Sequence, residues 1–211
     1  MLSEIETPTN ILVCELESKI IAAPTREEAL KRIEQAARVC YKSEDRISED
    51  SAVPLIKNLL KRKHMTPFEH VSVTVKFQLD RALQNELVRH RLASMNVSST
   101  RYCNYTANKF DGKLSFIQPD FKNTDSLMIW LNACVQCADN YTKLVENGEA
   151  PEMARSVLLL SLKTEVVFTA NLREWLHIFD LRTDPAAHPQ MRKVMIELQD
   201  QFKELYPEIF A

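Results

Sequence analysis

Apolar and polar residues alternate strictly over 71–79, where every odd position is apolar and every even position is polar. This period of two predicts a β-strand with one face on the core and the other on solvent or on another subunit. Antiparallel sheets show such one-sided burial. Shorter apolar runs predict three further strands, at 11–16, 114–117 and 166–170.

Helical spacing of apolar residues, together with capping residues, predicts the helices. Thr25 and Glu28 form a capping box at the start of a helix over about 26–41. Asp80 and Asn171 are placed to cap helices over about 81–91 and 172–181. Further helices are expected before the basic cluster 61–63, from a Thr124 cap to Asn147-Gly148, from Pro151 onward, and at 189–205.

These elements together predict an α+β fold, a small and mostly antiparallel sheet surrounded by several helices. At 211 residues the chain is long enough for one well-buried domain, and we expect a single catalytic domain over 1–211. Pro67 is expected to stop the second helix and to keep Thr66 extended.

The net charge of the chain is −2, which argues against a general nucleic-acid-binding or membrane-surface protein, because such proteins are usually basic. Any anion site must therefore be local. No apolar run approaches the roughly 20 residues of a membrane span. The start of the chain carries Glu4 and Glu6 and lacks the apolar core of a signal peptide, so we expect a cytoplasmic protein.

The numbers of glycine and cysteine residues argue against certain nucleotide-binding motifs and against metal sites. The two glycines, Gly112 and Gly148, are too few for a phosphate-binding P-loop or a dinucleotide-binding Rossmann turn. Five cysteines without an export signal predict free thiols, and Cys134 and Cys137 should face the core instead of a metal. His64 and His70 lack further ligands at a recognised spacing, so no metal site is predicted.

The segment 89–102, with sequence RHRLASMNVSSTRY, has the composition of an anion site. Three arginines, Arg89, Arg91 and Arg101, enclose short hydroxyl and amide side chains, and no acidic residue occurs from 87 to 110. Ser99 is interpreted as a hydrogen-bond donor to the anion and Cys103 as a packing residue, since neither lies beside an evident base. A solvated basic loop is the alternative.

Arginines elsewhere in the chain suggest a second ligand. Arg173 and His177 share one face of a helix, whereas Arg182 would lie about 180° around it. If 89–91 is not helical, His90 points away from its two arginine neighbours. Surface ion pairs of Arg173 and Arg182 with Glu174 or Asp184 are the alternative.

The segment 89–102 matches the signature RHRxxSxNxxSxRY at every specified position, and on these residues the chain resembles the flavin-dependent thymidylate synthases. The resemblance covers most of the chain beyond residue 60. Its other matched motifs are His64-x-Thr66-Pro67-Phe68-Glu69-His70, Ala154-Arg155-x-Val157-Leu158, Asn171-x-Arg173 and Leu181-Arg182.

The resemblance implies an enzyme that makes dTMP from dUMP without a cysteine nucleophile. Methylenetetrahydrofolate would supply the carbon, and NADPH would supply the reducing equivalents through bound FAD. The family's helix-and-sheet fold assembles as homotetramers in which each active site gathers residues from several subunits. The resemblance assigns no metal.

Matching positions imply the site residues. Those that would contact FAD are His64, Thr66, Arg89, His90, Arg91, Asn171, Arg173 and His177. Those that would hold dUMP are Glu86, Arg89, Ser98, Ser99, Thr100, Arg101, Arg155 and Arg182. Arg182 would be catalytic, because a guanidinium beside N3 and its neighbouring carbonyl stabilises the electron-rich uracil ring.

Three positions depart from the family pattern. Glu86 and His188 each stand where glutamine is usual, and Val97 stands where glutamate is usual. A carboxylate at position 86 could accept a hydrogen bond from a cytosine amino group, so a related enzyme acting on dCMP or transferring hydroxymethyl is an alternative. A second alternative is a single-stranded nucleic-acid-binding module that stacks bases on Tyr102 and Tyr105, against which the net charge argues.

Overall fold

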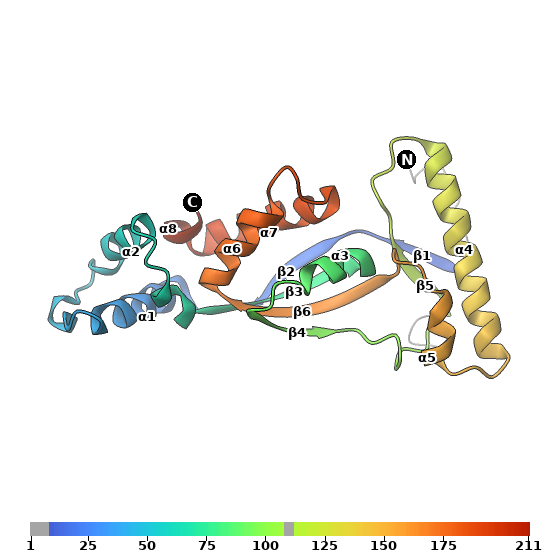
Figure 1. The fold of residues 1–211 in the computed structure, drawn as a ribbon, viewed down its shortest axis with the longest axis horizontal. Coiled ribbons are helices and arrows are strands. Elements are labelled where there is room, and N and C mark those ends of the chain that lie inside the picture. Colours follow the sequence, from blue (N-terminus) through green and yellow to red (C-terminus); the bar gives the residue numbers. More distant parts are fainter. Residues whose placement is uncertain (1–8, 108–111) are drawn as a thin grey trace. The chain divides into compact units, whose positions relative to one another are not determined.

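The computed structural model describes residues 9–107 and 112–211, and it has the predicted α+β composition (Figure 1). The strands are β1 Ile11–Cys14, β2 Glu17–Ala22, β3 Ser72–Asp80, β4 Ala93–Val97, β5 Leu114–Ile117 and β6 Lys163–Asn171. The α-helices are α1 Arg26–Val39, α2 Ala52–Lys61, α3 Arg81–Leu87, α4 Thr124–Glu146, α5 Pro151–Ala154, α6 Leu172–Arg182, α7 Pro189–Leu205 and α8 Pro207–Phe210. Three short 3₁₀ helices are η2 Glu44–Arg46, η3 Thr66–His70 and η5 Arg155–Val157.

The described residues divide into two compact units. The first unit comprises the described parts of 1–17, 78–89 and 96–166, and the second comprises 18–77, 90–95 and 167–211. Strands β3, β4 and β6 each contribute residues to both units. The expectation of a single catalytic domain stays a prediction.

The larger sheet has four strands in the order β2-β3-β6-β4. Strands β3 and β6 run in opposite directions: Leu172 N donates to the Val71 carbonyl at 2.9 Å, while the hydroxyls of Thr74 and Thr169 lie 2.9 Å apart. A position later in β3 thus meets an earlier position in β6, which confirms the predicted antiparallel sheet. A separate pair, β1 and β5, is parallel, with Ile11 opposite Leu114.

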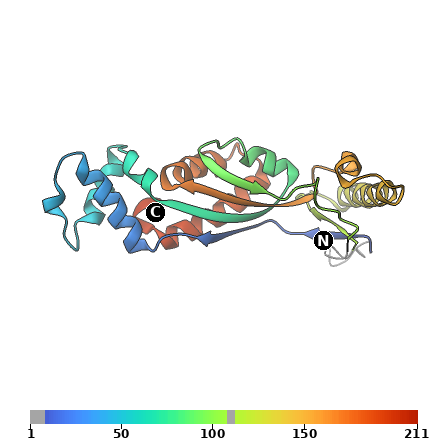
Figure 2. The same ribbon diagram turned by 90° about the horizontal axis from the view of Figure 1, so that it is seen from below.

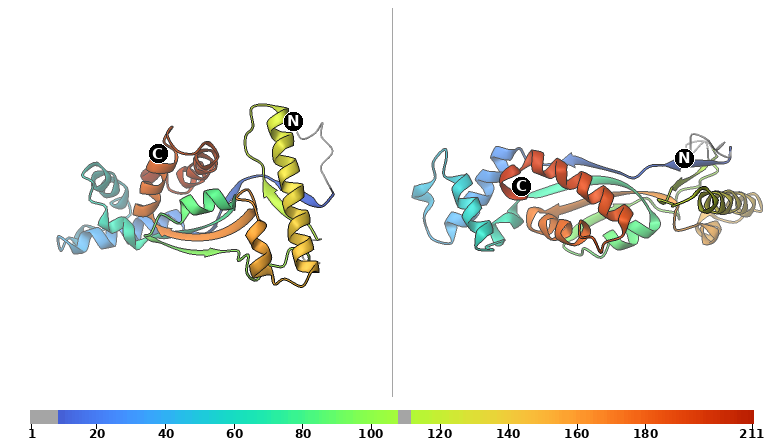
Figure 3. Two further views of the ribbon diagram at one scale, coloured as in Figure 1. Left: turned by 45° about the vertical axis from the view of Figure 1, so that its right-hand side comes forward. Right: turned by 90° about the horizontal axis from the view of Figure 1, so that it is seen from above.

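The core of the second unit lies between its sheet strands and helices α6 and α7, which cover one face of these strands (Figures 1 and 2). The right-hand view of Figure 3 shows α7 running along this face. Val73, Val75 and Phe77 are fully buried, as the alternation predicts. Trp175 packs against Phe168 and Phe202, with ring centroids 5.3 and 5.0 Å away. Full burial of such side chains contributes about 1.5–3 kcal/mol each.

The core of the first unit is built on α4. Its buried stripe, as the sequence predicts, includes Leu127, Leu131, Cys134, Ala138 and Tyr141. Cys134 and Cys137 are free buried thiols, and burial raises the pKa of Cys134 to about 12. Such a thiol stays protonated and unreactive, so the prediction of core-facing cysteines is confirmed.

The structure corrects four local expectations. The helix after Asp80 ends at Leu87 and not near 91, because the chain then leaves it to form β4 over 93–97, a strand that was not predicted. Strand β4 is an edge strand in which the half-buried Ala93, Met95 and Val97 alternate with the exposed Ser94 and Asn96, but a run of five residues is too short for the period of two to decide the element. Thr66 is the first residue of the 3₁₀ helix η3, where Pro67 is tolerated near the N-terminus, and not extended. Asn123, not Thr124, caps α4.

Within the described residues, no helix combines the length and the apolar character that crossing a membrane would require. The same residues hold no cluster of three or more His, Cys, Asp or Glu side chains able to bind a metal ion.

Candidate functional site

In the first unit, Ser98, the residue after β4, is hydrogen-bonded to β6. Ser98 N donates to the Glu165 carbonyl at 3.0 Å, and Glu165 N donates to Ser98 Oγ at 3.2 Å. Ser98 Oγ also lies 2.9 Å from Thr164 Oγ1. The serine therefore has its hydroxyl engaged in the sheet, and it anchors the residues that follow.

Residues 98–101, which we call the 98–101 turn, form a compact polar turn beside the 3₁₀ helix η5. Ser99 Oγ accepts a hydrogen bond from Arg101 N at 3.2 Å. Arg155 Nη1 donates to Thr100 Oγ1 at 3.3 Å, and Arg101 Nε lies 3.5 Å from Glu152 Oε2. The structure thus brings Arg155 to the predicted anion segment, and about half of the Arg101 side chain is exposed to solvent.

The side chain of Arg81 also contacts this turn, although Arg81 was not predicted as a site residue. Its Nη2 donates to the Ser98 carbonyl at 2.8 Å, and its buried Nε has no hydrogen-bond partner among the described residues. The pKa of Tyr105 is raised, mainly because the side chain is buried. The charge of Arg81 partly offsets this effect. Three guanidinium groups, those of Arg81, Arg101 and Arg155, therefore contact or belong to the 98–101 turn.

The other two predicted dUMP residues of the first unit lie at the end of α3. Glu86 is half-buried in the last turn of this helix, and Arg89 is exposed just beyond it. Arg89 N donates to the Glu86 carbonyl at 3.2 Å, so the backbone stays tightly wound up to Arg89.

In the second unit, His90 is buried against α6. Its side chain accepts a hydrogen bond at Nε2 from Arg182 Nε at 3.0 Å, and its Nδ1 lies 3.6 Å from Glu174 Oε1. The His177 ring lies 6.2 Å away, centroid to centroid. The side chain of His90 was expected to point away from those of Arg89 and Arg91. In agreement, Arg89 and Arg91 are exposed while His90 is 5% exposed.

His90 is neutral near pH 7. Burial and, to a smaller extent, the charges of Arg182 and His177 together lower its pKa from 6.5 to about 4. Because arginine can only donate, the Nε2 of His90 must be the acceptor, which leaves the ring proton on Nδ1.

A cavity of about 400 Å³ opens between α1, the end of α2 and η3. It is lined by Ala37, Cys40, Tyr41, Leu59, Lys63, His64, Met65, Thr66, Pro67 and Arg173. Three of the predicted FAD residues, His64, Thr66 and Arg173, therefore share one cavity. Arg173 forms an ion pair with Glu69 of η3, and not with Glu174 or Asp184 as the sequence analysis considered.

The remaining predicted FAD residues lie elsewhere. Asn171 caps α6, its Oδ1 accepting from Glu174 N at 2.9 Å. His90 packs against His177 of α6, and Arg91 is exposed. Arg173 bonds Glu69 and Arg182 bonds His90, and the expectation that these two arginines address different ligands stays a prediction.

Both helices that border the cavity end in a Schellman motif with lysine in place of the usual glycine. At the end of α2, His64 N donates to the Leu59 carbonyl at 2.9 Å and Lys63 N to the Leu60 carbonyl at 3.0 Å. Lys63 has φ of 57°, and Lys42 at the end of α1 has φ of 48°, both in the left-handed region. Such backbone costs about 1 kcal/mol or more for a side chain other than glycine.

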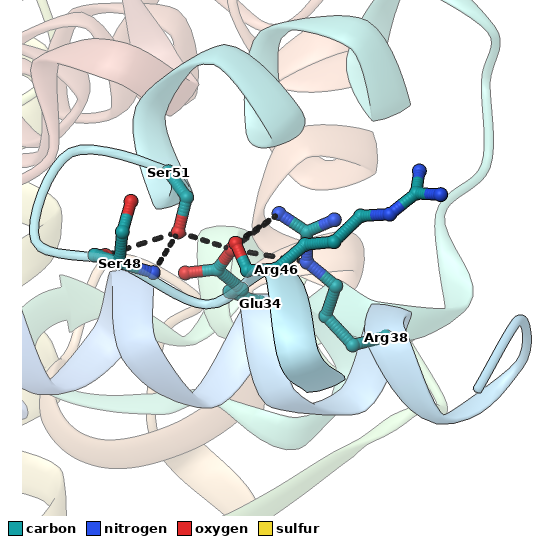
Figure 4. Close-up of polar contacts among 5 residues, drawn as sticks. All are labelled: Glu34, Arg38, Arg46, Ser48 and Ser51. Atoms are coloured by element: carbon teal, nitrogen blue, oxygen red, sulfur yellow. Dashed lines mark hydrogen bonds and ion pairs between the residues drawn. The ribbon is translucent and has the colours of Figure 1, made fainter. Parts of the chain in front are cut away.

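A buried carboxylate fixes the connection between α1 and α2 (Figure 4). Glu34 is 3% exposed and accepts from Arg38 Nη2 and from Ser51 Oγ, each at 2.8 Å. Ser51 Oγ in turn accepts from Ser48 N at 2.8 Å, and Arg38 Nη2 lies 3.4 Å from the Arg46 carbonyl. The cluster holds 46–51 on α1, the helix that supplies one wall of the cavity.

Several residues of these sites were not predicted from the sequence as site residues: Cys40, Tyr41, Lys63, Glu69, Arg81 and Glu174. Glu69 lies inside the motif 64–70, and its position next to matched residues was the available signal. Lys63 and Glu174 likewise lie next to the matched residues His64 and Arg173, whereas Cys40, Tyr41 and Arg81 come from segments distant in sequence to which no spacing rule points.

The fold and these sites define an α+β protein that presents clustered guanidinium and hydroxyl groups in one unit and a cation-bearing cavity in the other, the properties of an enzyme for phosphorylated ligands. The family model described as thymidylate synthase complementing protein, Thy1, matches residues 20–208.

Curated relatives carry the name flavin-dependent thymidylate synthase. That of Geobacter sulfurreducens is 31% identical over 183 residues, covering 83% of this chain and 78% of the relative. That of Kosmotoga olearia is 30% identical over 185 residues, covering 82% and 80%. The chain belongs to the Thy1 family, the flavin-dependent thymidylate synthases, and is an enzyme.

A solved structure agrees with this assignment. The UMP/dUMP methylase PolB of Streptomyces cacaoi, bound with 5-Br dUMP, superposes with a TM-score of 0.79 at 26% identity. The match covers 95% of both chains.

Proposed function

We propose that this chain converts dUMP to dTMP by reductive methylation, with methylenetetrahydrofolate as the carbon donor and NADPH as the reductant through bound FAD. The observation that carries the proposal is the 98–101 turn, where Arg155 meets the hydroxyl of Thr100. A turn rich in hydroxyls and guanidinium groups suits a phosphate monoester. PolB, a UMP/dUMP methylase of related fold, supports a pyrimidine nucleotide as the substrate.

In this proposal the dUMP phosphate is held by Ser98, Ser99, Thr100, Arg101 and Arg155, and Glu86 and Arg89 contact the same nucleotide. Arg182 is the catalytic residue. Its guanidinium stabilises negative charge that develops on the uracil ring when N3 loses its proton, and this charge makes C5 a better nucleophile.

The cavity of the second unit has a donor set that fits FAD. Lys63, His64 and Arg173 offer cationic or hydrogen-bonding groups for a pyrophosphate, Thr66 offers a hydroxyl, and Tyr41 offers an aromatic ring. Its volume of about 400 Å³ is in the range of small-molecule sites. When bound, FAD would supply the hydride for the reduction.

The complete set of residues proposed to hold the cofactor is His64, Thr66, Arg89, His90, Arg91, Asn171, Arg173 and His177. These residues bind and orient the cofactor, and the proposed reaction uses no cysteine nucleophile. The family resemblance implies homotetramers whose active sites gather residues from several subunits, and we propose this assembly for the present chain. Light scattering would test the number of subunits.

Two measurements on the purified protein test this function. The absorbance spectrum should show FAD, and turnover assays with methylenetetrahydrofolate and NADPH should form dTMP from dUMP. A colourless protein that does not bind added FAD contradicts the flavin part. Turnover of dCMP in place of dUMP would instead support the alternative that the Glu86 carboxylate suggests.

A further inference from the structure

Glu174 is a buried acidic residue outside the set of proposed ligand-binding residues. It lies in the first turn of α6 and is 6% exposed, and its backbone N–H is capped by Asn171. A carboxylate is rarely buried without a partner, because desolvation of the charge is costly. Its side chain lies 3.6 Å from Nδ1 of His90, beyond hydrogen-bond distance but close enough for a strong electrostatic contact.

We propose that Glu174 is a positioning residue for Arg182 and acts through His90: its carboxylate keeps the imidazole proton on Nδ1, so that Nε2 stays an acceptor for the Arg182 guanidinium. The catalytic consequence rests on the proposed role of Arg182. The tautomer of His90 does not depend on that role.

The geometry supports each step of this relay. Arg182 Nε donates to His90 Nε2 at 3.0 Å, which requires an unprotonated Nε2. The carboxylate on the opposite side of the ring favours the proton on the nitrogen that faces it. With the proton on Nε2, an N–H group would face the N–H of Arg182, and the two donors would repel each other.

Three charged or titratable groups of α6 surround the His90 ring, whose chain neighbours Arg89 and Arg91 are both exposed. Glu174 faces Nδ1, Arg182 faces Nε2, and the His177 ring packs edge-on at 6.2 Å. The position of Glu174 in the first turn of a helix favours its negative charge, because the helix dipole is positive there. Burial and the neighbouring cations keep His90 neutral, as its lowered pKa indicates. A neutral His90 ring with its proton on Nδ1 can accept a hydrogen bond from Arg182 and direct its own N–H towards Glu174.

Removal of Glu174 should therefore disturb the orientation of Arg182 more than the binding of ligands. In Glu174→Met, which keeps the length of the side chain and removes the acceptor, we expect kcat to fall about 10-fold or more, since small displacements of a catalytic group have effects of this size. The KM for dUMP and the affinity for FAD should change less than kcat, because His90 and Arg182 each supply one contact among several, and the 98–101 turn and the cavity are untouched. Glu174→Gln keeps an amide oxygen that can accept the Nδ1 proton, and it should retain most of kcat.

The test is the ¹⁵N spectrum of histidine-labelled protein, with the His90 signals identified by their absence in His90→Gln. The wild type and Glu174→Gln should show a protonated Nδ1 and an unprotonated Nε2, and Glu174→Met should shift towards a protonated Nε2. Asp180→Asn, which removes an exposed carboxylate from the same helix, is the matched control and should change neither the tautomer nor kcat.

A protonated Nε2 on His90 in the wild type would overturn the proposal, and this result does not require any variant to fold. An unchanged tautomer and kcat in Glu174→Met would overturn it as well. A protein with the expected tautomers but without thymidylate synthase activity would separate the positioning role of Glu174 from the proposed function.

Discussion

Arg155 and Thr100, 55 residues apart in the chain, are joined by a hydrogen bond of 3.3 Å between Nη1 and Oγ1. If this pair holds the nucleotide phosphate, Arg155→Ala should weaken dUMP binding about 10- to 100-fold, because hydrogen bonds to charged groups contribute about 1.5–3 kcal/mol. Thr100→Val removes only a neutral hydroxyl and should have the smaller effect. Calorimetric titration with dUMP measures both, and equal affinity of Arg155→Ala and wild type would exclude Arg155 from the site.

Lys63 combines strained backbone with a place in the cavity, so stability and cofactor binding should respond in opposite directions to Lys63→Gly. Glycine adopts the φ of 57° without strain, and we expect the free energy of unfolding to rise by about 0.5–1 kcal/mol. The affinity for FAD should fall, because a cation that lines the cavity is lost.

Lys42→Gly is the matched control for Lys63→Gly, since Lys42 has the same kind of backbone, with φ of 48°, and does not line the cavity. It should stabilise the protein similarly and leave FAD binding unchanged. Urea unfolding and a fluorescence titration with FAD measure the two effects. A similar loss of FAD affinity in both variants would show that the charge of Lys63 acts from a distance and not within the cavity.

Asn171 has two roles to separate, that of helix cap and that of proposed FAD ligand. Asn171→Ala should lower the free energy of unfolding by about 1 kcal/mol, because the Glu174 amide loses its acceptor. Asn171→Asp keeps a capping oxygen and should retain stability, but it replaces the amide donor by a negative charge and should weaken FAD binding. If Asn171→Asp binds FAD as the wild type does, Asn171 is a cap alone.

His90 should make the protein less stable in mild acid. Its pKa is about 4 in the folded state against 6.5 as the ordinary value, so between these pH values the unfolded chain holds more protons. The free energy of unfolding should then fall as the pH falls, by about 2 kcal/mol from this residue between pH 7.5 and 5.

The variant His90→Gln keeps an acceptor for Arg182 and cannot titrate, so it isolates this contribution. Its free energy of unfolding should fall less between pH 7.5 and 5 than that of the wild type, by about the same 2 kcal/mol. Urea unfolding at the two pH values gives the difference, and parallel losses in the two proteins would mean that His90 is not the group responsible.

The buried cluster of Figure 4 predicts a large stability effect at residues outside the proposed ligand-binding set. Glu34→Ala leaves the largely buried Arg38 without its carboxylate and should cost about 3 kcal/mol. The exposed pair Asp200 and Lys203 provides the control, since Asp200→Ala should cost less than about 1 kcal/mol. Thermal unfolding would contradict the assignment of Glu34 as a structural anchor if the two variants melted alike.

The sequence by itself determined those elements whose signals are local. Strict alternation located β3, helical spacing located α4 and α7, and the capping residues Thr25, Asp80 and Asn171 each accept the predicted backbone hydrogen bond. A cap or an amphipathic stripe depends on residues within a few positions of each other, so the sequence alone carries the information. The signature over 89–102 is local in the same sense, since a single uninterrupted segment carries the resemblance to the family.

Only the tertiary structure decided which side chains meet. The apolar alternation of β4 is short and only half-buried, and its pairing with β6, which continues at Ser98, is what establishes the strand. Arg173 bonds Glu69 in preference to its neighbour Glu174, which instead faces His90. These contacts join residues about 70 to 100 positions apart in sequence, and their geometry follows from how the helices pack on the sheet, a relation that no pattern along the chain encodes.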